Sequence, residues 1–436
     1  MNRIDNQHKF DSLRERFSVF TFESQSVIRE KGRLKLAFEF KLDDQYRFCP
    51  TLEIPARPFF DWVNIPMEQL EALAFQIGMT ELVSYWKIAC PKRVVVKPFA
   101  LTEQQIAFWK KLYYNGLGEF LYLNCIRVSK SDLMQIESVG NYHFDKVDVP
   151  LEEKTLVPVG GGKDSVVSLE CLRKEMPVIP MIVNPRGATL DCVKTAGYDE
   201  YDFVVINRTL DPTMLKLNAE GYLNGHTPFS ALLAFISILV AFGSRSKYIA
   251  LSNENSANES TVPGTNINHQ YSKSIEFERD FRNYVAESLN NKVQYFSFLR
   301  PLSELQIASL FAQCEAYHPV FRSCNVGSKT NSWCGHCPKC LFTWIILSPF
   351  LSREKLTSIF GKDLMDDDSL QPILKELNGT VSVKPFECVG TVEEVQACDA
   401  AVKGNRNQVD EILHRFNDDH FLPEKFEQLL KSHLHV

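Results

Sequence analysis

Residues 157–165 read VPVGGGKDS and join a strand-like run to a helix-like run. The three glycines, Gly160 to Gly162, allow the backbone to approach a ligand closely and to adopt positive φ angles. A helix that begins near Ser165 offers unpaired N–H groups and the positive end of its dipole, which favour a phosphate or pyrophosphate. The segment therefore predicts a strand, a phosphate-binding loop and a helix in succession. The alternative is a tight glycine turn without a ligand.

Two well-known phosphate-binding motifs do not fit this segment. A Walker A loop needs Ser or Thr after its lysine, whereas Asp164 follows Lys163. A dinucleotide-binding fingerprint needs a third glycine where Ser165 stands. The segment instead resembles the PP-loop, SGGxDS, of the ATP pyrophosphatases, with Gly160 in place of the usual serine. This resemblance implies that ATP is split between its α and β phosphates.

The resemblance also indicates which residues bind the nucleotide. The expected set is Gly160, Gly161, Gly162, Lys163, Asp164, Ser165 and Asn184, the last of which follows the next predicted strand. Asp164 is expected to orient the loop or to bind Mg²⁺, the usual companion of ATP phosphates. Lys163 is either a source of positive charge for the site or an ordinary solvated lysine, and the sequence leaves both open.

The composition limits the class of protein. The chain has 436 residues, of which 44% are hydrophobic and 23% are charged, enough for two globular domains. Its formal net charge of -6 counts against a nucleic-acid partner, because such surfaces are basic. The polar first residues lack a secretory core. The uncharged run from Phe229 to Gly243 is shorter than the ~20 residues that a spanning helix needs. We expect a cytoplasmic protein without a membrane partner.

The alternation of strand-like and helix-like segments from Thr155 onward predicts an α/β fold. Short apolar strands that alternate with helices indicate a parallel sheet covered on both faces, with ligands at the carboxyl ends of the strands. Strands are expected at Thr155–Val159, Val178–Val183, Phe203–Ile206, Tyr248–Leu251 and Val293–Phe298. Helices are expected at Ser165–Lys174, Thr189–Ala196, Thr227–Phe242 and Lys273–Leu289.

The remaining ranges complete the expected domain organisation. Residues 1–150 predict a smaller α+β domain that shapes the substrate and has no catalytic motif; residues 151–350 are the PP-loop domain, and residues 351–436 a helical appendage. In the first domain, residues 33–42 alternate between apolar and polar side chains, which is typical of a half-buried antiparallel strand. Helices are expected at Met67–Lys87 and at Leu101–Asn115, where Thr102 and Gln105 form a capping box.

Four cysteines gather in one short segment. Cys324, Cys334, Cys337 and Cys340 have C-x9-C-x2-C-x2-C spacing, which lets four thiolates meet one tetrahedral ion. In a chain without an export signal, this spacing favours metal over disulfides. It predicts a closed structural Zn²⁺ site, with His336 either replacing one thiol or facing solvent. The alternative is redox or sulfur-transfer chemistry. With the PP-loop, this pattern also resembles the 7-cyano-7-deazaguanine synthases between Thr155 and Phe342.

Two polar segments follow predicted strands. One is NGHTP at residues 224–228; the other is residues 252–274, which are dense in amides, hydroxyls and carboxylates. A polar loop of this length is uncommon unless it is functional, although a long solvated loop is the alternative. Candidates for proton transfer in the two segments, which the sequence does not rank, are His226, Glu254, His269 and Lys273.

These segments together resemble the UDP-N-acetylmuramoyl-L-alanyl-L-glutamate epimerase family. The resemblance rests on GGGKDS, NGHTP, SNENSANES, NHQYSKS, WCGHCPKCLF and KPFECVG (residues 384–390), and spans roughly residues 15 to 430. It implies that ATP becomes AMP and pyrophosphate while the terminal L-glutamate of a peptidoglycan precursor is inverted. Two alternatives stay open: another PP-loop carboxylate-adenylating ligase or a tRNA- or nucleobase-modifying enzyme, and a non-catalytic nucleotide-binding scaffold. The oligomeric state is not predicted.

Overall fold

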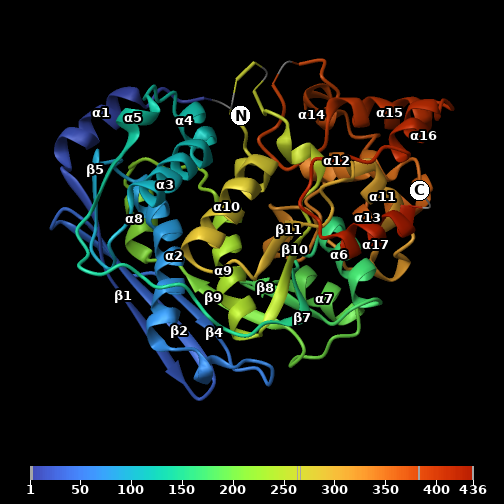
Figure 1. Ribbon diagram of the computed structural model, residues 1–436. Coiled ribbons are helices and arrows are strands. Elements are labelled where there is room, and N and C mark those ends of the chain that lie inside the picture. Colours follow the sequence, from blue (N-terminus) through green and yellow to red (C-terminus); the bar gives the residue numbers. More distant parts are fainter. Residues whose placement is uncertain (1–2, 263, 266, 382, 435–436) are drawn as a thin grey trace. The chain divides into compact units, whose positions relative to one another are not determined.

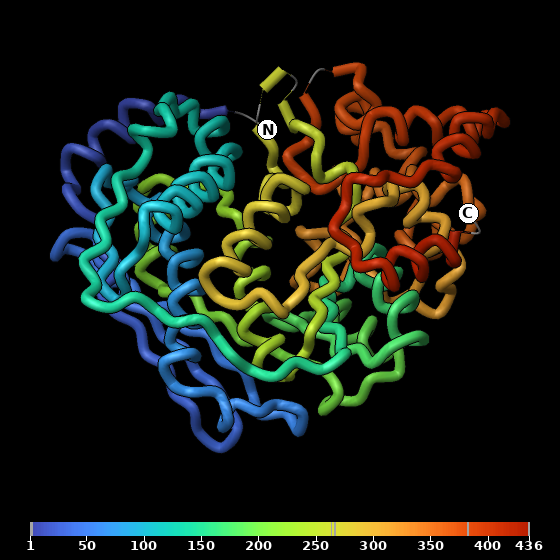
Figure 2. Tube along the Cα trace, viewed as in Figure 1, coloured from blue at the N-terminus to red at the C-terminus, as the bar shows by residue number. Residues whose placement is uncertain are grey.

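A computed structural model describes residues 3–262, 264–265, 267–381 and 383–434. The chain forms two compact units, and each unit is assembled from three separated segments (Figures 1 and 2). Unit 1 comprises Met1–Glu152, Val205–Lys247 and Tyr271–Gln294. Unit 2 comprises Glu153–Val204, Tyr248–Gln270 and Tyr295–Val436. The linear division of the chain at residues 150 and 350 stays a prediction.

Unit 1 combines a mixed sheet with helices. Its strands follow the order β9-β4-β2-β1-β5-β6, and β3 pairs with β2. The strands are β1 (Val19–Glu30), β2 (Arg33–Leu42), β3 (Tyr46–Phe48), β4 (Thr51–Ile54), β5 (Arg93–Val96), β6 (Gln135–Ser138) and β9 (Val204–Thr209). The helices are α1 (Gln7–Arg16), α2 (Met67–Trp86), α3 (Glu103–Gly116), α4 (Gly118–Leu123), α5 (Lys130–Leu133), α8 (Pro212–Ala219), α9 (Phe229–Gly243) and α10 (Ile275–Ser288), with 3₁₀ turns η1 (Trp62–Asn64) and η3 (Tyr271–Lys273).

The antiparallel pair β1–β2 confirms the strand expected at residues 33–42. Leu34, Leu36 and Phe38 alternate toward the core with exposed or half-buried neighbours. Lys31 and Gly32 turn the chain with φ angles of 50° and 76°, as a two-residue hairpin turn requires.

Aromatic packing fills the interior of unit 1. Helix α2 lies against β1, where Phe75 stacks on Phe22 with ring centroids 5.8 Å apart. Helix α9, the apolar helix expected from the sequence, packs Phe235 against Trp109 of α3 at 5.2 Å. Within the described residues, no helix combines the length and the apolar character that a membrane crossing requires.

Unit 2 is the α/β part that carries the glycine-rich loop. Its strands follow the order β11-β10-β7-β8, and β7 and β8 are parallel, with Thr155 opposite Val178. The strands are β7 (Glu152–Pro158), β8 (Val178–Val183), β10 (Ser246–Leu251) and β11 (Gln294–Ser297). The helices are α6 (Lys163–Arg173), α7 (Gly187–Thr195), α11 (Glu304–Ala312), α12 (Pro338–Leu347), α13 (Arg353–Phe360), α14 (Gln371–Leu377), α15 (Val392–Val402), α16 (Asn407–Leu413) and α17 (Glu424–Leu434), with 3₁₀ turns η2 (Asn255–Asn258), η4 (Glu315–Tyr317), η5 (Gly327–Lys329) and η6 (Asp368–Leu370).

The predicted α/β class is confirmed, and the expected strands and helices recur with small shifts at their ends. One segment differs from the expectation. Residues 129–151, where no helix or strand is predicted from the sequence, contain α5 and β6, and β6 pairs with β5 in parallel. Strand β6 shows no alternation of apolar and polar residues in the sequence, because only its Ile136 is buried.

Candidate functional site

The glycine-rich loop joins β7 to α6 within unit 2. Gly162 is the N-cap of α6, and no side chain caps this helix end among the described residues. The first N–H groups of α6 are therefore positioned to bind an anion. A Cβ atom added at Gly160 would meet nothing within 4 Å, so the start of the loop borders open space.

Packing requires a glycine at Gly161 and leaves little room for a side chain at Gly162. Gly161 has a φ of 80°, and a Cβ there would lie 2.9 Å from the backbone of Ala188 and Thr189 in α7. Its carbonyl oxygen accepts a 2.8 Å hydrogen bond from the N–H of Arg322. A Cβ at Gly162 would approach the Ser323 Oγ to 2.9 Å. The loop is thus held between α7 and the segment that precedes the cysteines.

Lys163 is an internal cation rather than a solvated loop lysine. Its side chain is 3% exposed, and its ammonium contacts the carboxylates of Asp164 and Glu304. Burial opposes the charged form, but the two carboxylates outweigh it and raise the pKa of Lys163 above its ordinary value. The ion pair joins the start of α6 to the start of α11.

The other nucleotide-binding candidates lie at the same edge of unit 2. Ser165 Oγ donates to the Gly162 carbonyl oxygen at 3.0 Å and so bonds within the loop. Asn184 follows β8 directly and has a φ of 49°, an unusual backbone conformation for a residue other than glycine. Their assignment to the nucleotide stays a prediction.

A buried carboxylate from the C-terminal region supports this edge. Glu394 is 3% exposed and accepts the Leu305 N–H at 3.1 Å, so it caps the first turn of α11. The same carboxylate accepts the N–H and hydroxyl of Thr391 at the start of α15, where the two residues form a capping box. Burial raises the pKa of Glu394. Nothing in the local sequence indicates that this capping pair contacts α11.

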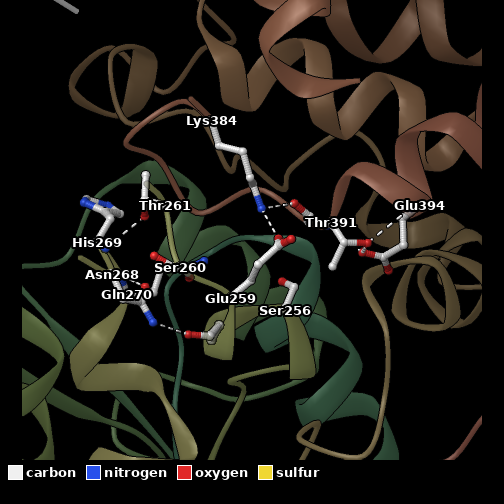
Figure 3. A network of polar contacts seen from close by, with 12 residues as sticks. Ser256, Glu259, Ser260, Thr261, Asn268, His269, Gln270, Lys384, Thr391 and Glu394 are labelled. Atoms are coloured by element: carbon white, nitrogen blue, oxygen red, sulfur yellow. Dashed lines mark hydrogen bonds and ion pairs between the residues drawn. The ribbon is translucent and has the colours of Figure 1, made fainter. Parts of the chain in front are cut away.

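Figure 3 shows how the C-terminal region reaches the second polar segment. Lys384 contacts the Glu259 carboxylate and donates to the Gly390 carbonyl oxygen at 2.8 Å. The ring of His269 meets the ring of Phe386 edge to face, with centroids 6.5 Å apart. Residues of the KPFECVG segment therefore contact the polar segment directly.

The polar segment is also folded by its own hydrogen bonds (Figure 3). Thr261 Oγ1 accepts the His269 N–H at 3.0 Å, and Asn268 Nδ2 donates to the Ala257 carbonyl oxygen at 2.8 Å. Ser256 Oγ donates to the nearly buried Glu254 carboxylate at 3.0 Å. These bonds hold the described residues of the segment in a defined arrangement.

The four proton-transfer candidates are divided between the units. Glu254 and His269 belong to unit 2, whereas His226 and Lys273 belong to unit 1. His226 Nδ1 lies 3.6 Å from the Glu119 carboxylate, and Lys273 ends the turn η3. Glu119 was not expected from the sequence, because helix α4 carries no recognisable motif. The roles of all four candidates stay predictions.

The four cysteines form one cluster. The Sγ atoms of Cys324, Cys334, Cys337 and Cys340 all lie within 4.8 Å of one another. Individual Sγ–Sγ separations are 3.8 Å for Cys324–Cys337, 3.7 Å for Cys334–Cys340 and 3.5 Å for Cys337–Cys340. Zn–S bonds of ~2.3 Å in a tetrahedron place sulfurs about 3.8 Å apart, whereas a disulfide needs about 2 Å. The thiols therefore fit a structural zinc ion.

The surroundings of the cluster match a metal site. The Gly327 N–H donates to Cys324 Sγ at 3.1 Å, and Gly335 turns the chain with a φ of 71°. Such N–H···S bonds orient a thiolate ligand. His336 is exposed, and its Nδ1 lies 2.7 Å from the Cys334 carbonyl oxygen. Among the described residues, the group that could hold a metal here consists of the four cysteines and does not include His336.

Comparison with protein families covers both units. A family model described as the MurL N-terminal domain matches residues 11–298, and one described as the MurL C-terminal domain matches residues 320–427. The chain belongs to the MurL family. The matched ranges of the MurL models include the glycine-rich loop, both polar segments, the cysteine cluster and the KPFECVG segment.

Curated relatives support the MurL assignment over most of the chain. A Micromonospora protein is 37% identical over 396 residues, covering 87% of this chain and 85% of the relative. A Salinispora tropica protein is 36% identical over 399 residues, covering 87% and 83%. A Xanthomonas oryzae pv. oryzae protein is 32% identical over 420 residues, covering 93% and 90%. Each is named UDP-N-acetyl-alpha-D-muramoyl-L-alanyl-L-glutamate epimerase.

Proposed function

We propose that this chain is a UDP-N-acetyl-alpha-D-muramoyl-L-alanyl-L-glutamate epimerase. It inverts the terminal L-glutamate of this peptidoglycan precursor to D-glutamate and is therefore an isomerase. The observation that carries the proposal is the similarity to three curated relatives of that name, each aligned over more than four fifths of both chains. The reaction belongs to the cytoplasm, where ATP and UDP-linked precursors are available.

The inversion is coupled to ATP. An oxygen of the glutamate α-carboxylate attacks the α-phosphorus of ATP, the bond to the β-phosphate breaks, and pyrophosphate leaves. Support comes from the glycine-rich loop, because the uncapped start of α6 and the open space beside Gly160 suit a polyphosphate. Asp164 is the candidate ligand for Mg²⁺, which would offset phosphate charge; its side chain is 34% exposed at the first turn of α6.

Adenylation explains why an epimerase would consume ATP. A Cα proton beside a carboxylate is very weakly acidic, since its removal places a second negative charge next to the first. The acyl-adenylate has no carboxylate charge, and its carbonyl accepts the electron pair when the Cα–H bond breaks. A proton then returns to the opposite face, and water cleaves the adenylate to release AMP. A well-placed base is worth about 10²–10⁴-fold in such a step.

The proton-transfer groups belong to the set His226, Glu254, His269 and Lys273. The nucleotide is assigned to Gly160, Gly161, Gly162, Lys163, Asp164, Ser165 and Asn184. Of these, Lys163 acts indirectly, because its ammonium is already engaged by two carboxylates. A zinc ion held by the four cysteines would be structural, since four thiolates leave no position for water.

The test follows ATP and glutamate together. The protein is incubated with ATP, Mg²⁺ and UDP-N-acetylmuramoyl-L-alanyl-L-glutamate in D₂O, and pyrophosphate, glutamate mass and glutamate chirality are measured. Pyrophosphate with deuterated D-glutamate is the expected result. Pyrophosphate without inversion would indicate ligase chemistry instead. Inversion without ATP would overturn the adenylation step, and neither product from the folded, zinc-loaded protein would overturn the proposal.

A further inference from the structure

The NGHTP loop of unit 1, residues 224–228, is held in place by helices that lie far away in the sequence. Asn124 Nδ2 donates to the Asn224 carbonyl oxygen at 3.2 Å, just beyond the end of α4. Lys87 Nζ, at the end of α2, donates to the Gly225 carbonyl oxygen at 2.5 Å. Two successive carbonyl groups of the loop are therefore fixed by buried side chains.

The remaining positions of the loop are fixed by packing. A Cβ at Gly225 would lie 2.8 Å from the ring of Phe120, so only glycine fits against α4. Pro228 in turn lies so close to Gly116 that a Cβ there would approach it to 2.7 Å. The loop therefore packs on α3 and α4, and these contacts fix the backbone on either side of His226.

His226 is the one titratable residue of this loop, and it meets a carboxylate. Its Nδ1 lies 3.6 Å from Glu119 Oε2; the side chains are 28% and 9% exposed, respectively. That separation is within ion-pair range but longer than a hydrogen bond of about 2.7–3.2 Å. The largely buried carboxylate is therefore placed to orient the ring and to stabilise it when it carries a proton.

We propose that Glu119 is the positioning residue for His226, and that the pair transfers the Cα proton in the epimerisation. This inference rests on the proposed function. The Cα–H bond breaks, its proton forms the Nε2–H bond of His226, and the electron pair moves to the acyl-adenylate carbonyl. The positive imidazolium lies beside the negative Glu119. A second group donates a proton to the opposite face. His226 then releases its proton to solvent and the second group takes one up, which restores the starting state of both.

The contacts that hold the loop against the ends of α2 and α4 keep His226 in a fixed position. A base must stay within hydrogen-bond reach of the proton that it removes, and small displacements reduce the rate strongly. Lys87, Asn124 and Phe120 restrict the backbone that precedes His226. Pro228 packs against Gly116 after it, and Glu119 restricts its ring. The N-terminal part of the chain, expected only to shape the substrate, thus supports the chemistry itself.

The experiment separates adenylation from proton transfer. Wild type, His226→Ala, Glu119→Gln and Glu119→Asp are compared for pyrophosphate release and for deuterium incorporation at Cα with the muramoyl dipeptide in D₂O. Glu23→Gln is the matched control, because Glu23 is a partly buried carboxylate of unit 1 that pairs with Lys97 at 2.8 Å, away from the loop. Thermal unfolding is measured for each variant.

We expect His226→Ala to slow deuterium incorporation by about 10²–10⁴-fold and Glu119→Gln by about tenfold or more, with single-turnover pyrophosphate release unchanged. Glu119→Asp restores part of the loss, because it retains the charge. Equal incorporation in wild type and Glu119→Gln would overturn the inference. A parallel loss of pyrophosphate release would assign Glu119 to folding or substrate binding, which also overturns it. If wild type itself gives no pyrophosphate or inversion, the proposed function fails instead.

Discussion

Gly160 and Gly161 are adjacent in the glycine-rich loop, but their surroundings in the structure differ. Gly161 has a positive φ and a backbone neighbour 2.9 Å from any added Cβ, whereas a Cβ at Gly160 would meet nothing within 4 Å. Gly161→Ala should therefore lower the free energy of unfolding by about 1–3 kcal/mol and abolish pyrophosphate release. Gly160→Ala should change stability by less than about 0.5 kcal/mol. Urea unfolding measures the free energy of unfolding of both variants. Equal losses of that free energy would contradict the packing role of Gly161.

A buried lysine predicts how stability depends on pH. Burial, followed by repulsion from Arg208, lowers the pKa of Lys87 from 10.5 to about 8. Between these values the unfolded chain binds more protons than the folded protein, so the stability contributed at this position rises with pH. Below about pH 8 both states are protonated, and the contribution is constant.

The corresponding variant is Lys87→Met, which keeps the length of the side chain without its charge. The difference in unfolding free energy, wild type minus variant, should increase by roughly 3 kcal/mol between pH 7.5 and 10.5. Denaturant unfolding at several pH values measures it, and the difference cancels the contribution of other titrating groups. A constant difference would show that Lys87 titrates normally in the folded protein.

Among the secondary-structure elements, helices α11 and α15 share one carboxylate. Oε2 of Glu394 accepts from Thr391 at the start of α15, and Oε1 accepts the Leu305 N–H of α11. Glu394→Gln replaces one acceptor oxygen with a donor, so one helix start loses its partner. We expect a loss of about 1–3 kcal/mol, against about 1 kcal/mol for Thr391→Ala, which affects α15 alone. Equal losses in thermal or urea unfolding would show that the contact with α11 contributes nothing.

Elements with strong local signals were predictable from the sequence. The alternation of residues 33–42 and the Thr102–Gln105 capping box are local patterns, and both are confirmed. The cysteine cluster is likewise encoded in short spacings, and its thiols do gather. By contrast, the Lys163–Glu304 pair joins residues 141 positions apart, and no local pattern records it. Local periodicity therefore predicted the elements, while tertiary partners such as Glu119 and Glu394 required the fold.

For the molecule as a whole, we expect the cysteine cluster to stabilise the folded state of unit 2. Its four thiols belong to a chain segment that begins near the glycine-rich loop, where Arg322 and Ser323 support Gly161 and Gly162, and ends in α12. Zinc binding contributes directly to folding free energy when the ligands are brought together only in the folded state. Loss of the ion should therefore loosen the loop as well as the cysteine segment.

The test uses Cys337→Ser with Cys49→Ser as its control, since Cys49 is exposed and lies outside the cluster. We expect Cys337→Ser to lose about one equivalent of zinc and to unfold at a lower temperature, with Cys49→Ser unchanged in both. Metal content is measured by elemental analysis, and unfolding by calorimetry. A stable, zinc-replete and inactive Cys337→Ser protein would contradict a structural role.

The interleaving of the two units has a consequence for synthesis on the ribosome. Unit 1 needs its first segment, then Val205–Lys247, and finally Tyr271–Gln294. Trp109 emerges from the ribosome well before Phe235 and Tyr284, the rings that cover it in the finished protein. At elongation rates of about 5–20 residues per second, the wait lasts many seconds. During that time the aromatic surface of α3 lacks these partners, and exposed apolar surface of this kind makes a nascent chain prone to aggregation.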